Sequence, residues 1–200
     1  YWWQVMVWDN EGNASAWSAP ARWHVGLKED EWQGKWIGAP WQGEDSYDIM
    51  GSREVVPAPL LRKEFSVKKP IKQAYFYGTG LGYFELYING ERVGEDYLSP
   101  NQTNYTTRPK LDTRGIVVTD PFEEYTVMYL THDITSLIEQ GENAVGAILG
   151  NGFYDVVEYW PAMGYGTPRF MGQIEIIYED GSREVIASDS SWRAERSAIV

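Results

Sequence analysis

The stretch Leu81–Gly94, LGYFELYINGERVG, is the part of the chain that decides the fold. Apolar and polar residues alternate before Asn89-Gly90, and a period of two is typical of a half-buried β-strand. Asn-Gly is the dipeptide that two-residue hairpin turns favour, because both of its positions must adopt a positive φ. The stretch therefore predicts a β-hairpin whose alternating aromatic residues form the packing face of a sheet.

Further short strands are expected on both sides of this hairpin. LLRKEFSV and QAYFYGTG precede it with the same alternation, and Ala144–Leu149 forms a short buried strand within THDITSLIEQGENAVGAILG. Phe170–Tyr178 and Arg183–Ala187, joined by EDGS, predict a closing hairpin. The chain has no long amphipathic helix and no repeat of 20–50 residues. The predicted class is all-β, an antiparallel β-sandwich of the jelly-roll or galactose-binding-like type.

Local residue types add finer expectations. The glycines of Gly78–Gly82 favour a β-bulge or a bend. Asp133–Ile138 has the pattern of one helical turn, with Asp133 or Thr135 as N-cap, and Thr126–Leu130 is expected to begin a strand. The aromatic residues expected in the core or on a sheet face are Trp36, Phe65, Tyr75, Tyr77, Phe84 and Tyr87.

The N-terminal residues form a separate pattern. Tyr1–Val7 and Ala21–Val25 are predicted strands, and DNEGN at 9–13 supplies turn residues between them. This pair resembles the last hairpin of a fibronectin type III-like or immunoglobulin-like module. Because an isolated hairpin is marginal in water and the chain begins inside a predicted strand, we expect a piece of a longer protein. The predicted organisation is a remnant at 1–27, a linker at 28–35 and a β-sandwich domain at 36–200.

Composition limits the function classes. The net charge of −12, without a Lys/Arg stripe, argues against nucleic acid as a partner. The absence of cysteine excludes disulfides, thiolate nucleophiles and Cys-based zinc sites. No apolar run approaches the roughly 20 residues of a membrane span.

No catalytic constellation is predicted. A glycosidase needs two carboxyl groups about 5–9.5 Å apart, and no pattern brings the loop acids, such as Glu123 and Glu124, across one cleft. The two histidines, His24 and His132, lie near no nucleophile motif of the GxSxG kind. We therefore assign no catalytic residue.

Six motifs in order carry a family resemblance: WIGAP, PLLRKEFSV, GLGYFELYING, LSPNQTNY, HDITSLIEQGENAVGAILGNGFY and YEDGSREVIASDSSWR. Together they resemble the N-terminal β-sandwich domain of bacterial α-L-rhamnosidases, over about residues 32–200. The resemblance implies a glycoside hydrolase that removes terminal rhamnose from glycans with a separate, C-terminal (α/α)6 barrel. It implies an accessory domain that supports this barrel, is inactive alone and requires no cofactor. It also implies a periplasmic or secreted location. The alternatives are the sugar-binding domain of a β-galactosidase or β-glucuronidase, and a purely structural spacer.

Loop aromatics and amides are the candidate carbohydrate contacts, because flat rings and hydrogen-bonding groups suit sugars. An equal alternative is that they dock onto the catalytic domain, the expected partner, rather than bind a rhamnose-containing glycan. The candidates are Trp41, Tyr47, Tyr105, Asn151, Tyr154, Tyr159 and Trp160.

Calcium is a further alternative. Ca²⁺ takes six to eight oxygen ligands from flexible loops, although no EF-hand spacing occurs here. The resemblance adds that some family members use this domain as a calcium-dependent rhamnose-binding module. The candidate ligands are Asp45, Asp48, Asn101, Asn104 and Asp155.

Overall fold

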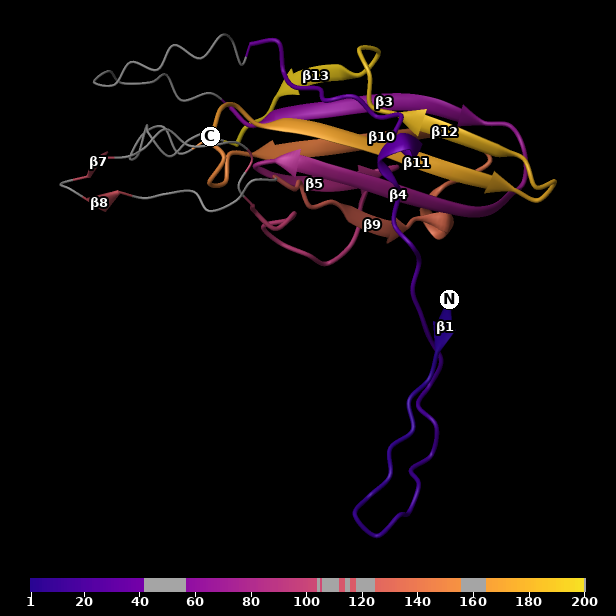
Figure 1. Cartoon of the computed structure of the whole chain (residues 1–200). Helices are drawn as coiled ribbons and strands as arrows, with labels where there is room; N and C mark the ends of the chain where they lie inside the picture. The colour runs from indigo at the N-terminus through magenta and orange to yellow at the C-terminus, as the bar shows by residue number, and fades with distance from the viewer. Residues whose placement is uncertain are drawn as a thin grey trace. The chain divides into compact units, whose positions relative to one another are not determined.

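The computed structural model describes residues 1–41, 57–103, 105, 112–113, 116–117, 125–155 and 165–199 (Figure 1). The chain divides into two compact units, Tyr1–Trp32 and Gln33–Val200. The division falls within the stretch 28–35. Across the described residues, no helix has the length and apolar character needed to cross a membrane.

The first unit is a long hairpin. Strand β1 (Trp2–Trp3) pairs antiparallel with β2 (Ala21–Arg22), and an isolated bridge joins Trp8 to Ala14. The Asp9 carboxylate closes the turn, since its Oδ1 accepts hydrogen bonds from the backbone N–H groups of Glu11 and Asn13 at 2.9 and 2.8 Å. A short 3₁₀ helix, η1 (Glu29–Glu31), follows the hairpin.

The second unit is an antiparallel β-sandwich. One sheet has the order β13 (Arg193–Arg196), β3 (Pro59–Val67), β10 (Gly141–Gly150), β5 (Tyr83–Ile88) and β6 (Glu91–Arg92). The other has the order β12 (Arg183–Ala187), β11 (Arg169–Tyr178), β4 (Ile71–Leu81) and β9 (Leu130–Asp133). A small pair, β7 (Asp112–Thr113) and β8 (Ile116–Val117), lies apart from both sheets in the pairing order. From β3 to β11 the chain crosses repeatedly between the two sheets, as a jelly-roll does. The all-β prediction is confirmed.

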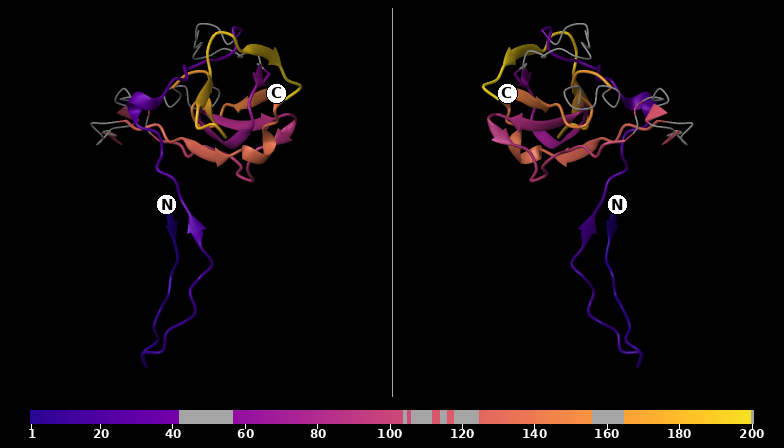
Figure 2. Two further views of the ribbon diagram at one scale, coloured as in Figure 1. Left: turned by 90° about the vertical axis from the view of Figure 1, so that its right-hand side faces the viewer. Right: turned by 90° about the vertical axis from the view of Figure 1, so that its left-hand side faces the viewer.

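The core lies between the two sheets (Figure 2). Phe76 and Phe170 of the four-stranded sheet stack at 6.3 Å between ring centroids, and Phe84 of the five-stranded sheet meets Phe170 edge-on at 5.4 Å. All three rings are buried, so they fix the spacing of the layers.

The Leu81–Gly94 stretch forms the predicted hairpin. Asn89 and Gly90 have φ angles of 51° and 88°, which Asn and Gly tolerate best. Phe84 faces the core, whereas Tyr83 and Tyr87 lie half-buried on the outer face of the sheet. The Tyr87 hydroxyl donates a hydrogen bond to Glu85 at 2.9 Å. The aromatic residues are therefore divided between the two faces, rather than all packing inward.

The glycines of β4 form a bend but no bulge. The register is continuous through Gly78, which pairs with Gly172. A Cβ at Gly78 would lie 2.1 Å from Cζ of Phe76, so this glycine makes room for the phenyl ring. Gly82, with φ of 98°, forms the bend between β4 and β5. The irregularity of the β4–β11 pair lies instead beside Ile177, so of the two expected alternatives the bend is present and the bulge is not.

Of three finer predictions, the one for Trp36 is wrong and the other two are met in part. Trp36 is 41% exposed and lies outside any strand. Strand β9 begins at Leu130, the end of the range expected to start it. The helical turn is a 3₁₀ helix, η2 (Thr135–Leu137), whose N-cap is Ile134. Asp133 still helps to close this turn, because its Oδ1 accepts a hydrogen bond from the Thr135 backbone N–H at 3.1 Å.

Candidate carbohydrate-contact site at one end of the sandwich

The candidate site begins where β10 ends. Gly150 pairs with Tyr83, the first residue of β5, and the chain then turns back so that the Asp155 N–H donates to the Asn151 carbonyl at 3.3 Å. Gly152 has a φ of 53°, and a Cβ there would lie 2.5 Å from Nε2 of Gln102. Glycine therefore lets this turn close onto the Gln102 side chain.

Three tyrosines meet at this end. The Tyr105 ring lies edge-on to Tyr154 and to Tyr165, with 5.2 Å between centroids in each case. Tyr154 and Tyr165 stack at 5.6 Å with an interplanar angle of 21°. The Tyr165 N–H also donates to the Tyr154 carbonyl at 2.7 Å. We call these three residues the tyrosine cluster; it joins segments about 50 residues apart in the chain.

Polar groups lie close to the tyrosine cluster along the chain. Asn151 is exposed and Asp155 is 7% exposed. Nε2 of Gln102 is buried and donates a hydrogen bond to no residue that the structure describes. Burial raises the pKa of the Tyr105 phenol, so this hydroxyl stays protonated at neutral pH. Phenol and amide groups beside flat rings can exchange hydrogen bonds with the hydroxyls of a neutral ligand.

The structure brings together some of the predicted contacts. Tyr105, Tyr154 and Asn151 lie at this end, whereas the Trp41 ring lies under the Arg196 guanidinium, 5.5 Å from its Cζ to the ring centroid. Tyr47, Tyr159 and Trp160 lie outside the described residues.

The sequence analysis missed two residues of the site. Tyr165 satisfies the criterion that selected Tyr154, an aromatic residue in the loop that follows β10. For Gln102 the sequence indicates only a position in a loop, because its approach to Gly152 depends on tertiary contacts.

Only two of the five candidate calcium ligands lie among the described residues. Asn101 is exposed and Asp155 is buried, while Asp45, Asp48 and Asn104 lie outside the described residues. Among the residues with described positions, no group of three or more His, Asp or Glu side chains is placed to hold a metal ion. The calcium hypothesis therefore stays a prediction.

The fold and this site define a class: an antiparallel β-sandwich domain with hydrogen-bonding aromatic loops at one end. The family description "Alpha-L-rhamnosidase N-terminal domain" matches residues 69–124 and 118–200, which together exceed half of the chain. Residues 1–29 match the description "Rha78A-like, N-terminal immunoglobulin domain". The chain belongs to the alpha-L-rhamnosidase N-terminal domain family.

Individual relatives agree with this assignment. An alpha-L-rhamnosidase of Alteromonas sp. (strain LOR) is 32% identical over 99% of this chain and 20% of its own length. The structure of alpha-L-rhamnosidase from Dictyoglumus thermophilum is 37% identical, with a TM-score of 0.71, and the match covers 98% of this chain and 20% of that one. The Streptomyces avermitilis alpha-L-rhamnosidase complexed with L-rhamnose is 34% identical over 70% of this chain and 12% of that one, with a TM-score of 0.55.

The match concerns a minor part of these relatives. The chain spans about a fifth of the length of the Alteromonas and Dictyoglumus proteins. The comparisons do not favour the alternative β-galactosidase or β-glucuronidase parent, since the matching family and relatives are rhamnosidases.

Proposed function

We propose that this chain is a non-catalytic accessory domain of an α-L-rhamnosidase that removes terminal rhamnose from glycans. The catalytic barrel, in another part of the same protein, is its principal partner. The observation that carries the proposal is a family match to the N-terminal domain alone, over about a fifth of the relatives' length. Residues 1–27 then belong to an immunoglobulin-like module, residues 28–35 form a linker, and the protein works in the periplasm or outside the cell.

The finer part of the proposal is that the tyrosine cluster contacts rhamnose-containing glycan. Three rings meet within 5.6 Å between centroids, and amides of Asn151 and Gln102 lie on the adjoining loops. Ring edges and faces that carry a polar group suit a ligand with both C–H and O–H surfaces. The structure of the Streptomyces relative was solved with L-rhamnose, which makes this sugar the first ligand to test.

A second candidate function is docking onto the catalytic domain. Phe153, which immediately precedes Tyr154, is 69% exposed. An exposed phenyl ring offers apolar area without a hydrogen-bonding group, which suits a protein surface better than a sugar. On this alternative the tyrosine cluster orders the loop, and Phe153 makes the contact.

Calorimetric titration of the 200-residue chain with L-rhamnose separates these proposals. We expect saturable heat that Tyr154→Ala weakens about ten-fold, or about 1.4 kcal/mol. Tyr97→Ala is the matched control, because Tyr97 is 76% exposed, lies against Arg92 and is not in the tyrosine cluster. Titrations with calcium and then with chelator test the metal.

If no part of the heat depends on Tyr154 under any of these conditions, sugar binding by the tyrosine cluster is excluded and the docking role remains. The same chain is expected to release no p-nitrophenol from p-nitrophenyl α-L-rhamnoside. Measurable turnover that survives repurification would contradict the accessory role itself.

A further inference from the structure

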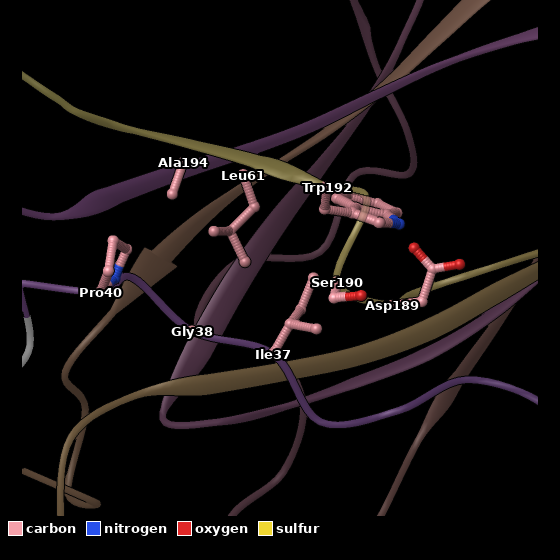
Figure 3. A pocket seen from close by; sticks show the side chains of 8 residues that line it. All are labelled: Ile37, Gly38, Pro40, Leu61, Asp189, Ser190, Trp192 and Ala194. Carbon is pink, nitrogen blue, oxygen red and sulfur yellow. The ribbon is translucent and has the colours of Figure 1, made fainter.

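A pocket of about 270 Å³ lies between residues 37–40 and strand β13 (Figure 3). None of the residues that line this pocket belongs to the tyrosine cluster. Leu61 of β3 points into it from the sheet. Ile37 and Pro40 line it from the N-terminal segment, and Trp192 and Ala194 line it from the turn and the edge strand. The pocket volume is just below the roughly 300–1,000 Å³ of drug-sized ligand sites.

The walls of this pocket are held firmly. Ile37 and Phe170 exchange two backbone hydrogen bonds of 2.8 and 2.9 Å, which fasten the N-terminal segment to β11. The Trp192 indole packs on Phe170 at 5.6 Å between centroids, and its Nε1–H donates to the Ala187 carbonyl at 3.1 Å. The indole is thus oriented by the core before any ligand arrives, which lowers the entropic cost of binding.

One end of the pocket is polar. Asp189 and Ser190 lie together beside the Trp192 ring, as Figure 3 shows. The Asp189 carboxylate accepts hydrogen bonds from the backbone N–H and hydroxyl of Ser191 and lies 3.2 Å from the Lys63 ammonium. Lys63 balances its charge, so this end offers hydrogen-bonding oxygens without a net charge.

The opposite end is apolar. Pro40 and Ala194 lie at the far side of the pocket from Asp189, with Leu61 between the two ends (Figure 3). A cationic ligand would meet the Asp189 carboxylate, which is already paired with Lys63. An anionic ligand would lie next to the same negatively charged carboxylate. A fully apolar ligand would make no hydrogen bond to the partly exposed Asp189 carboxylate or to the exposed Ser190 hydroxyl.

We infer that this pocket is a second binding site, which takes one neutral sugar ring with its C–H face toward Trp192 and its hydroxyls toward Asp189 and Ser190. It is a site additional to the loop end that the proposed function uses. Its size admits a single ring, and its apolar end suits a deoxy position or a methyl group rather than a further hydroxyl.

The indole N–H of Trp192 provides a test at the site itself. Two-dimensional ¹H–¹⁵N spectra of the chain resolve the indole groups of its 10 tryptophans, and Trp192→Phe identifies the signal of interest. We expect L-rhamnose to change the chemical shift of the Trp192 indole signal until the site is saturated. Glycerol at equal hydroxyl concentration should produce no saturable change. Ser190→Ala is expected to weaken the response several-fold.

Matched variants decide where the response arises. Ala194→Phe fills the pocket and is expected to abolish the Trp192 response. Glu195→Phe adds the same ring one residue later, on the opposite face of β13, and should leave it unchanged. The remaining indole signals report whether each variant is folded.

Three results would overturn the inference: no movement of the Trp192 signal, a response that survives Ala194→Phe, or one that Tyr154→Ala removes. In the last case the sugar binds at the loop end alone. Calorimetric heat that Tyr154→Ala leaves unchanged, together with a retained Trp192 response, would count against the tyrosine cluster and leave the pocket standing.

Discussion

The two ends of strands β5 and β10 are built in different ways. At one end, Asn143 is 4% exposed; its Nδ2 donates to the carbonyls of Glu139 and Gly141, and its Oδ1 accepts from the Glu139 N–H. Asn89 adds to this network, since its Nδ2 donates to Oδ1 of Asn143 at 2.9 Å. At the other end, the tyrosine cluster joins its segments through ring contacts of 5.2–5.6 Å between centroids, and the Tyr165 N–H donates to the Tyr154 carbonyl.

This difference separates folding from recognition. Amide hydrogen bonds are directional, and a buried amide that loses its partners costs the full desolvation of each group. Ring contacts at 5–6 Å tolerate changes of angle and contribute about 0.5–1.5 kcal/mol per pair. We therefore expect substitutions at the asparagine end to affect stability, and those at the tyrosine end to affect mainly what the domain contacts.

The largest effect is expected from Asn143→Ala. The change leaves the backbone groups of Glu139 and Gly141 without the amide and should lower the free energy of unfolding by about 3 kcal/mol. Urea denaturation followed by tryptophan fluorescence measures it. Asn151→Ala, at an exposed amide of the other end, is the control and should cost under about 0.5 kcal/mol. Equal losses of unfolding free energy in the two variants would contradict the expected difference between the two ends of the strands.

A smaller effect is expected from Tyr165→Leu. Leucine keeps most of the apolar area but loses the stacking on Tyr154 and the edge contact with Tyr105, so we expect a loss of about 1 kcal/mol. The same change combined with Tyr154→Leu should cost less than the sum of the single changes, because the pair shares one contact. Strict additivity in urea denaturation would show that the rings do not stabilise one another.

The smallest expected effect is on the pH dependence of the free energy of unfolding. Burial raises the pKa of Tyr105 above its ordinary value near 10, so the folded state resists ionising this phenol. Its contribution to stability is fully present below the ordinary pKa and is lost as the pH rises through the raised pKa. Tyr105→Phe should therefore reduce the alkaline decline in unfolding free energy in part, because burial also raises the pKa of Tyr77 and of Tyr178 to about 12, and Asn143→Ala should leave its slope unchanged. A decline of unchanged slope in Tyr105→Phe would place the titrating group elsewhere.

Much of the fold was predictable, because its signals are local. Alternation placed β3, β5 and β11 nearly to the residue, although β10 extends three residues before its expected start at Ala144, and Asn89-Gly90 specified its turn. Trp36 was misplaced because a large apolar side chain predicts burial only on average. The sequence pattern also did not predict the role of Gly78, because that role depends on the position of the Phe76 ring.

The site was predictable as a region rather than as an arrangement. Loop position selected Tyr105, Tyr154 and Asn151, which the structure places at one end of the sandwich. The same rule grouped Trp41 with them, although it lies against Arg196 of β13. Contacts between loops distant in sequence, such as Tyr105 with Tyr165, follow from strand order and register, which the sequence pattern does not state. The binding role of these residues stays a prediction.

The facing glycines of β4 and β11 have a consequence for how this domain can change over time. Gly78 and Gly172 are register partners, and a Cβ on either would lie within 3 Å of the Phe76 ring. The two glycines and the phenylalanine are therefore sterically coupled, although Gly78 and Gly172 lie almost a hundred residues apart in the chain. A smaller residue at 76 would have to come before a side chain at Gly78, and Gly172 would also need room beside Phe170, whose Cζ would lie 2.9 Å from its Cβ, so the order of substitutions is as constrained as their identity.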